Sequence, residues 1–171
     1  RQAQQQIYAK FSSKMLSVCR QYIKDIHHAE DVMITGFMKV FTNLKSFEHK
    51  GSFEGWIRRI MIYECIDFLR VKKNNFNHQD IDDVTVSENE SVYEMEDFSV
   101  DDIQNMIDNL PDGYKMVFNL YAIEGYKHQE IAEMLKISEG TSKSQLSHAR
   151  KLLQQQITDL KNKLNDIATI R

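Results

Sequence analysis

The chain has 171 residues, enough for one domain of ordinary size or two small ones, and its hydrophobic content of 42% supports a folded core. One proline, six glycines and long stretches of helical periodicity predict an all-α protein. No apolar run of about eighteen residues is present to span a membrane, and the first residues lack a secretory signal. Cys19 and Cys65 follow no C-x-x-C pattern, as expected for thiols in a reducing compartment. We therefore expect a cytoplasmic protein.

The net charge of −3 is unevenly distributed along the chain. Residues 1–79 carry 13 Lys and Arg against 7 Asp and Glu, residues 80–110 carry none against 11, and residues 111–171 carry 9 against 7. Two basic segments are therefore joined by an acidic one. Salt screens charges beyond about 8–10 Å in the cell, so nucleic-acid binding depends on local basic charge rather than on the total.

Three helices are predicted in a first domain, residues 1–73, because apolar side chains recur there at spacings of three and four. The predicted helices cover residues 7–23, 29–44 and 53–71. In the second of them, Asp31 falls in the first turn, where a negative charge suits the helix dipole.

Aromatic and basic residues interleave in and around the predicted loop 45–52. Cations neutralise phosphates, and aromatic rings stack unpaired bases at about 1–3 kcal/mol per base, so the combination suits capture of a DNA strand once the duplex opens. Phe41 and Trp56 fall at core spacing, and we assign them mainly to the core. The candidates for contact with an extruded base or a single strand are Lys45, Phe47, Lys50, Ser52, Arg59, Tyr63 and Arg70.

Residues 74–99 lose helical periodicity and gain acidic side chains, which predicts a flexible, solvated linker. Helices resume in a second domain, residues 100–171. Pro111 is expected in the first turn of a helix that runs to about Glu124 and ends at Gly125 in the left-handed conformation.

Residues 125–153 predict two helices joined by a tight turn, the arrangement of a reader of the DNA major groove. Ser138 precedes the second helix and can cap it. The core positions are Ile131, Ala132, Leu135, Ile137 and Leu146. Hydroxyl and basic side chains of the outward face can reach base edges and phosphates, and these are Ser138, Thr141, Lys143, Ser144, Ser147 and Arg150. Such helix pairs also occur in bundles that do not touch DNA, so the spacing alone leaves both possibilities open.

The second of these helices continues well past the groove-reading part, with apolar residues at spacings of three and four from Leu146 to Ile167. We expect this tail to pack on its own domain. The alternative is a seam for self-association or for a partner.

The sequence of residues 131–150 resembles the −35-reading domain of bacterial sigma factors, especially the extracytoplasmic-function group. The matching motif is I-A-x-x-L-x-I-S-x-G-T-x-K-S-x-L-x-x-A-R. Three motifs in the first domain resemble the promoter-opening domain of the same family. They are A-E-D-V-x-x-x-x-F-x-x-V-F, S-F-x-x-W-I-x-R-I and C-I-D-F-L-R, in residues 29–41, 52–60 and 65–70.

This resemblance implies that the first domain binds RNA polymerase and melts the −10 element while the second reads the −35 element. The implied partners are core RNA polymerase, promoter DNA and an anti-sigma factor. Asp31, Phe37 and Val40 are the implied polymerase contacts. The resemblance also implies that the acidic linker occupies a basic channel of the polymerase, although a solvated linker is the simpler interpretation.

The sequence departs from the family pattern at four places. Ile34-Thr35-Gly36 replaces Gln-Glu-Thr on the surface that meets polymerase, and Tyr63 replaces an asparagine. Lys136 replaces the usual glycine of the turn, and Ser142 replaces a buried valine where the two helices cross.

No nucleotide-binding glycine motif, H-E-x-x-H pattern or zinc spacing occurs, so we expect no catalysis, cofactor, metal or small-molecule substrate. The sequence therefore predicts an alternative sigma factor. One alternative is a helix-turn-helix regulator that acts without being a polymerase subunit, with residues 1–71 as a sensor or dimerisation domain. A second alternative is an interaction adaptor in which the helix-turn-helix is only a scaffold.

Overall fold

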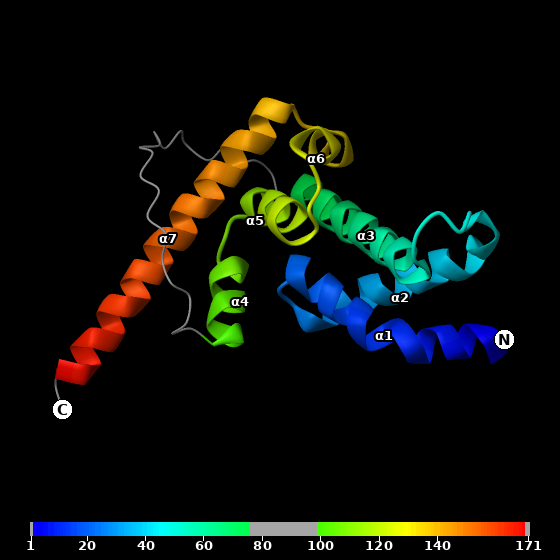
Figure 1. Ribbon diagram of the computed structural model, residues 1–171, viewed down its shortest axis with the longest axis horizontal. Helices are drawn as coiled ribbons and strands as arrows, with labels where there is room; N and C mark the ends of the chain where they lie inside the picture. The colour runs from blue at the N-terminus through cyan, green and yellow to red at the C-terminus, as the bar shows by residue number, and fades with distance from the viewer. Residues whose placement is uncertain (1, 76–98, 170–171) are drawn as a thin grey trace. The chain divides into compact units, whose positions relative to one another are not determined.

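The computed structural model describes residues 2–75 and 99–169, and every regular element in these two ranges is a helix. The predicted all-α class is therefore confirmed. The chain divides into two compact units, Arg1–Gln79 and Asp80–Arg171 (Figure 1). Most of the predicted acidic linker, 74–99, lies outside the described residues.

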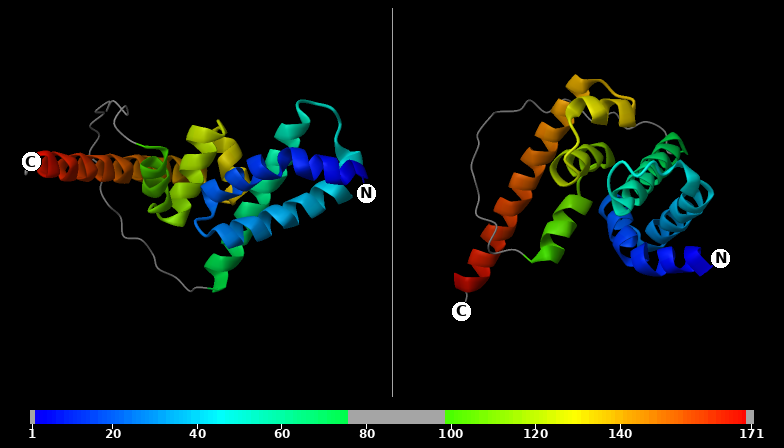
Figure 2. Two further views of the ribbon diagram at one scale, coloured as in Figure 1. Left: turned by 90° about the horizontal axis from the view of Figure 1, so that it is seen from below. Right: turned by 45° about the vertical axis from the view of Figure 1, so that its right-hand side comes forward.

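The first unit is a bundle in which α1, α2 and α3 pack against one another (Figure 1, Figure 2). Its elements are α1 (Gln2–Tyr22), α2 (Ile26–Thr42), the short 3-10 helix η1 (Leu44–Ser46) and α3 (Phe53–Asn75). The three helices expected from periodicity are present, and η1 occupies the beginning of the predicted loop.

The second helix begins at Ile26 rather than at residue 29, because Asp25 caps it. The backbone N–H of His28 donates to Asp25 Oδ1 at 2.9 Å, and this bond holds the pKa of the Asp25 carboxyl below its usual range. Asp31 consequently lies in the second turn of α2, so its predicted position in the first turn is wrong.

Large apolar side chains from all three helices fill the core of the first unit, and each is worth about 1.5–3 kcal/mol when fully buried. The largest fully buried ones are Met15, Tyr22, Phe37, Ile57 and Met61. Cys19 and Cys65 are free thiols in the same core. A hydrogen bond with Cys19 and burial both raise the pKa of Cys65, so its thiol stays protonated.

Gly36 allows α2 to approach α3 closely. It is buried, and a Cβ atom at this position would lie closer to the Met61 sulfur than van der Waals contact allows, and Met61 is itself fully buried. The space that a side chain at Gly36 would need is therefore filled by Met61. At Gly36, the departure from the family pattern is a packing feature.

We expect Gly36→Ala to destabilise the first unit by about 1–3 kcal/mol, because overpacking against Met61 outweighs the roughly 1 kcal/mol that alanine gains over glycine inside a helix. In a Met61→Ala background the same change should be stabilising. Urea unfolding followed by the fluorescence of Trp56 measures this effect, since the only tryptophan of the chain lies in the first unit. Gly55→Ala is the control, because Gly55 is exposed and its added Cβ would meet only the Ser52 hydroxyl. Equal effects of Gly36→Ala in both backgrounds would contradict this account.

The second unit is also helical, and its elements are α4 (Val100–Asp108), α5 (Asp112–Phe118), the π-helix η2 (Asn119–Ile123), α6 (His128–Leu135) and α7 (Glu139–Thr169). Ser99 starts α4 with a capping box, in which its hydroxyl accepts from the Asp102 N–H and the Asp102 carboxylate accepts from the Ser99 N–H, both at 3.1 Å. Pro111 is the N-cap of α5, one residue before its predicted place in the first turn.

The helix expected to run to Glu124 changes character after Phe118. Its last turn is a π-helix, closed by the Glu124 N–H, which donates to the Asn119 carbonyl at 3.0 Å. Gly125 then takes the left-handed conformation with φ of 78°, as predicted. The chain reverses there because the Tyr126 N–H donates back to the Leu120 carbonyl at 2.9 Å.

A buried ion pair links α4 to α5 in the second unit. Lys115 Nζ lies 4.0 Å from Asp108 Oδ1, and the Gln104 side chain donates to the same oxygen at 3.3 Å. Both charged side chains are almost fully buried. Removing one partner of such a pair costs about 3–5 kcal/mol, so this contact fixes how α4 packs.

The last helix, α7, extends past the other helices of its unit (Figure 2). Leu153, Ile157 and Leu160 of the predicted apolar tail are partly buried, so the tail packs on its own unit in part. No helix in the two described ranges is long and apolar enough to cross a membrane.

Candidate nucleic-acid interface

The predicted helix-turn-helix consists of α6, a three-residue turn and α7. Lys136 ends α6 in the left-handed conformation, with φ of 56° and ψ of 46°, and the Ile137 N–H donates back to the Ala132 carbonyl at 3.1 Å. A non-glycine residue pays about 1–2 kcal/mol for this conformation. The turn therefore keeps the geometry of a glycine turn although Lys136 replaces the glycine.

Ser138 caps α7 as predicted. Its hydroxyl accepts from the Thr141 N–H at 2.9 Å, and it shares a second hydrogen bond with the Thr141 hydroxyl at 2.8 Å. The cap joins the first two predicted DNA contacts into one hydrogen-bonded group at the start of α7.

The predicted DNA-facing residues lie at the start of α7 and outside its buried stripe. Ser142, Leu146 and Ala149 are buried against the rest of the unit. The six candidates are instead exposed or partly exposed, and they are Ser138, Thr141, Lys143, Ser144, Ser147 and Arg150. The exposed part of this segment therefore carries four hydroxyls and two cations.

Several of these polar groups already have partners within the helix. The Ser144 hydroxyl donates to the Thr141 carbonyl at 3.1 Å, and Lys143 Nζ pairs with Glu139 Oε1 at 2.7 Å. The Lys143–Glu139 pair is exposed on both sides, so it contributes little to stability and Lys143 can exchange Glu139 for a phosphate.

A group of side chains beside this face was not anticipated from the sequence. We call Tyr121, His128, Ser142 and Arg150 the His128 cluster. His128 Nδ1 and Ser142 Oγ are 2.9 Å apart, and the rings of Tyr121 and His128 stack with centroids 4.6 Å apart. The Arg150 guanidinium lies 5.7 Å from the centre of the Tyr121 ring. The cluster therefore connects η2, α6 and α7.

His128 makes Ser142 a satisfied buried polar group. Ser142 has no exposed surface, and a buried hydroxyl without a partner would cost about 1–3 kcal/mol. Its hydrogen bond to His128 replaces the apolar contact that the usual valine would make. Ser142, which departs from the family pattern, is thus matched by His128 as its hydrogen-bond partner.

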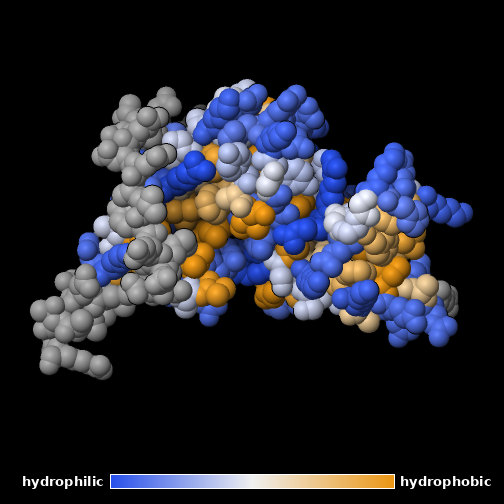
Figure 3. Space-filling view, viewed as in Figure 1, coloured by the Kyte–Doolittle hydropathy of each residue, from blue (hydrophilic) through white to orange (hydrophobic). Residues whose placement is uncertain are grey.

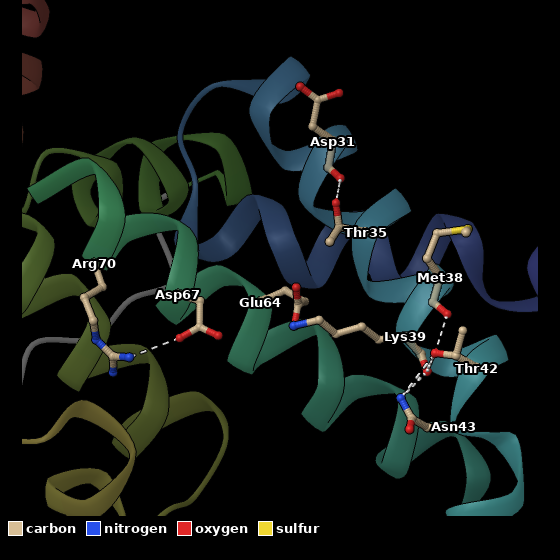
Figure 4. Close-up of polar contacts among 9 residues, drawn as sticks. All are labelled: Asp31, Thr35, Met38, Lys39, Thr42, Asn43, Glu64, Asp67 and Arg70. Atoms are coloured by element: carbon tan, nitrogen blue, oxygen red, sulfur yellow. Dashed lines mark hydrogen bonds and ion pairs between the residues drawn. The ribbon is translucent and has the colours of Figure 1, made fainter. Parts of the chain in front are cut away.

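In the first unit, a pocket of about 270 Å³ opens between α2, η1 and α3. Its lining combines an indole, a phenol, an amide, a hydroxyl and an ion pair, and consists of Lys39, Asn43, Ser46, Trp56, Ile60, Tyr63 and Glu64. Figure 4 shows Lys39 of α2 and Glu64 of α3 pointing toward each other, and the two form an ion pair in which Glu64 is the buried partner. Of the predicted single-strand contacts, only Tyr63 lines this pocket, and the Arg59 guanidinium lies 5.9 Å from the centre of the Tyr63 ring.

The other predicted single-strand contacts lie around the pocket or farther along α3. Phe47 is partly buried in an aromatic cluster, 5.2 Å from Phe53 and 5.5 Å from Trp56 between ring centres, so its ring is already engaged. The Ser52 hydroxyl caps α3 by accepting from the Gly55 N–H at 3.0 Å. The remaining candidates on this side carry exposed or partly exposed cations, and they are Lys45, Lys50 and Arg70.

The predicted polymerase contacts do not share one environment. Phe37 and Val40 are 2% and 0% exposed, so direct contact through their side chains does not fit the structure. Phe37 packs between Tyr8 and Phe41, with ring centres 4.9 and 5.9 Å away. The family resemblance implied this contact, and the structure places both side chains on the inner face of α2.

The outer face of α2 is apolar at two positions, Ile34, which belongs to a departure from the family pattern, and Met38, which the sequence did not single out. Ile34 is 51% exposed and Met38 is 61% exposed, and both lie on the same side as Asp31 and Thr35. Figure 4 shows Asp31, Thr35 and Met38 along this helix, and Figure 3 shows apolar surface (orange) on the first unit, at the right of the picture. We call Asp31, Ile34, Thr35 and Met38 the α2 face.

Sequence families match both units of the chain. The family Sigma-70 region 2 matches residues 7–75, and the family Sigma-70, region 4 matches residues 100–153. The ECF RNA polymerase sigma factor SigW of Bacillus subtilis is 30% identical over 163 residues, which cover 88% of this chain and 86% of SigW. The ECF RNA polymerase sigma-E factor of Haemophilus influenzae is 24% identical over 169 residues, which cover 90% of this chain and 87% of that protein.

Two solved structures share the fold. One is the sigma factor RpoE in complex with the anti-sigma factor NepR from Bartonella quintana, with a TM-score of 0.58 at 18% identity over 90% of this chain and 96% of RpoE. The other is CnrH in complex with the cytosolic domain of CnrY, with a TM-score of 0.52 at 19% identity over 92% of this chain and 89% of CnrH.

The two helical units and their motifs, in this order, are those of a sigma-70-type transcription factor. More particularly, the chain belongs to the extracytoplasmic-function (ECF) group of the sigma-70 family.

Proposed function

We propose that the chain is an alternative sigma factor, which binds core RNA polymerase and directs it to particular promoters. The observation that carries this proposal is the presence, in one chain, of a helix-turn-helix with a polar and basic outer face in the second unit and of a pocket with aromatic lining, of a size for one base, in the first unit. A regulator that binds only duplex DNA has no use for such a pocket.

In the second unit, α7 enters the major groove at the −35 element. Lys143 and Arg150 supply cations for phosphates and guanine edges, and the hydroxyls of Thr141, Ser144 and Ser147 supply short-range hydrogen bonds to bases. Buried Leu146 and Ala149 hold the opposite side of α7 in place, so the reading face keeps a fixed orientation.

In the first unit, the pocket beside α3 receives a base from the melted −10 strand. Its volume of about 270 Å³ suits one base, and Trp56 and Tyr63 provide aromatic surface for stacking. The cations of Lys45, Lys50 and Arg59 lie outside the core and pair with phosphates of the strand. Stacking and charge together stabilise the open state of the promoter.

The α2 face docks on core RNA polymerase. Exposed Ile34 and Met38 bury apolar area in the complex, while Asp31 offers a carboxylate to a basic partner. An anti-sigma factor is a further partner of the chain, in keeping with the related RpoE and CnrH structures, which contain NepR and CnrY. All of these steps take place in the cytoplasm, where the polymerase works.

Each unit alone offers few phosphate contacts, so the free protein binds promoters weakly. Polymerase holds the two units at the spacing of the −10 and −35 elements, and the second contact then becomes intramolecular. A helix-turn-helix regulator acting alone remains the alternative, and tight promoter binding without polymerase would favour it.

The paired substitution Lys143→Ala with Arg150→Ala tests the −35 assignment. We expect run-off transcription by reconstituted holoenzyme to fall, and the slope of log affinity against log salt to weaken by up to about 1.8, because each lost phosphate contact removes about 0.9. Lys161→Ala with Lys163→Ala is the matched control, since it removes the same charge from the distal part of α7. Equal losses in both pairs would point to a general charge effect. No transcription from a genomic promoter pool by wild-type holoenzyme would refute the proposed function itself.

The pair Ile34→Asp with Met38→Asp tests the α2 face. Loss of two buried apolar contacts, each worth about 1.5–3 kcal/mol, should lower affinity for core polymerase more than tenfold, as measured by fluorescence anisotropy of the labelled chain. Helix content should not change, because both side chains are exposed. Val71→Asp with Val100→Asp changes two other exposed apolar residues and should bind like wild type. Unchanged affinity of the α2 pair would exclude this face.

Tyr63→Ala tests the pocket. We expect the open promoter complex to lose about 1–3 kcal/mol of stability, because the ring no longer stacks on a base. Tyr63→Phe keeps the ring and should retain most of the stability. The lifetime of the open complex, followed by 2-aminopurine fluorescence in the −10 element, gives the measurement, and identical lifetimes for Tyr63→Ala and wild type would rule out stacking at this position.

A further inference from the structure

The His128 cluster lies beside the face of α7 to which the −35 reading is assigned, and only its Arg150 has so far been given a role in that reading. Tyr121 forms the centre of the cluster, because its ring stacks on His128 at 4.6 Å with an interplanar angle of 22° and also lies 5.7 Å from the Arg150 guanidinium. Figure 1 shows α6 next to the start of α7. The imidazole of His128 in α6 is therefore held next to the recognition helix by contacts from two further elements, η2 and α7.

The hydrogen bond to Ser142 orients the imidazole. Nδ1 of His128 is engaged at 2.9 Å with the buried Ser142 hydroxyl, whereas Nε2 has no hydrogen-bond partner among the residues that the structure describes. The ring is partly exposed. One nitrogen is thus fixed to the protein, and the other is available to an external group.

The charges around His128 favour its neutral form in the free protein. Partial burial and then Lys143 lower the pKa of His128, Arg150 adds to this effect, and Glu139 opposes it. At the start of its own helix, Lys127 and Glu130 carry opposite charges, and from η2 the uncharged Tyr121 stacks on one face of the ring. The nearest recognition-helix groups are thus two cations and one carboxylate.

DNA would reverse this balance. Phosphates that pair with Lys143 and Arg150 cancel the two cations that disfavour an imidazolium, and a phosphate oxygen within reach of Nε2 would accept a hydrogen bond from it. The stacked Tyr121 ring favours the charged form too, because its π-face attracts cations.

We propose that His128 takes up a proton when the second unit binds DNA, and that the imidazolium donates from Nε2 to a backbone phosphate flanking the −35 element. His128 is then a phosphate-binding residue whose affinity for phosphate depends on pH, and Ser142 is the positioning residue that orients its ring. This inference rests on the proposed function, since it requires that α7 binds promoter DNA.

The sign of the pH dependence follows from linkage. The bound state holds the proton more tightly than the free state, so promoter affinity rises as the pH falls. Affinity changes with pH only between two pKa values of His128. The lower one belongs to the free protein, in which the pKa is lowered, and the higher one belongs to the proposed DNA complex. Within that interval one proton changes affinity by at most about tenfold for each pH unit.

The test compares holoenzymes carrying wild-type chain, His128→Gln or His148→Gln in binding to a labelled promoter fragment, by fluorescence anisotropy from pH 5.5 to 8.5 at constant ionic strength. Glutamine can keep a hydrogen bond to Ser142 but does not titrate. His148→Gln is the matched control, because His148 also stacks on a tyrosine of the second unit, Tyr114, at 5.4 Å. The affinity of each variant holoenzyme is divided by that of the wild type at the same pH, so the pH dependence of the polymerase itself cancels.

We expect wild type to gain up to about tenfold over His128→Gln as the pH falls from 8 to 6, and His148→Gln to follow wild type. Parallel profiles for wild type and His128→Gln would overturn the inference while leaving the proposed function in place. A wild-type advantage that shrinks on acidification would also overturn it, because protonation would then weaken the complex. Failure of wild-type holoenzyme to bind any promoter at any pH would instead refute the proposed function, and the inference with it.

Discussion

The crossing of α6 over α7 is the contact on which DNA reading depends, because it fixes which side of α7 faces outward. Ile131 of α6 and Leu146 and Ala149 of α7 form its apolar part, and all three are buried. Its polar part is the hydrogen bond between His128 and Ser142. Ser142 needs a hydrogen-bond partner that the valine usual at this position would not need, because a buried hydroxyl without a hydrogen bond destabilises the fold. The crossing thus combines packing with one directional bond, which leaves little freedom for α7 to rotate.

The sequence predicts those parts of the fold that depend on one local property, such as the spacing of apolar residues or the chemistry of a helix cap. Apolar spacing placed the helices, and Ser138 and Gly125 were correctly identified as a cap and a left-handed residue because their roles depend on local chemistry. The errors lie at element ends and in helix type. Asp25 extends α2 toward the N-terminus through one hydrogen bond, and the π-turn after Phe118 depends on a bond to a carbonyl five residues back. Neither is visible in a periodicity of apolar residues.

The candidate sites could be predicted from the sequence less completely than the fold, because they combine residues from several elements. Helical spacing correctly separates the buried and exposed sides of α7, and in α2 it places Phe37 and Val40 among the apolar core positions. The family resemblance nevertheless implied these two as polymerase contacts, and it did not point to the exposed Ile34 and Met38. Lys39 and Glu64 line the pocket from different helices, and no local pattern relates them. His128 likewise meets Tyr121 only after the chain has turned at Gly125, so the sequence alone gave no reason to group them.

The π-helix gives the second unit one extra residue between α5 and the turn at Gly125. A π-turn accommodates this residue as a bulge, and it shifts the side chains of this last turn by roughly 100° around the helix axis. Homologues that lack the bulge would align with this chain only after a one-residue gap in this segment. Such a deletion would preserve the hydrophobic pattern of the neighbouring helices, yet it would swing Tyr121 out of register with α6. A change of length here would therefore alter the electrostatics beside α7 without any change in the amino acids of α7 itself.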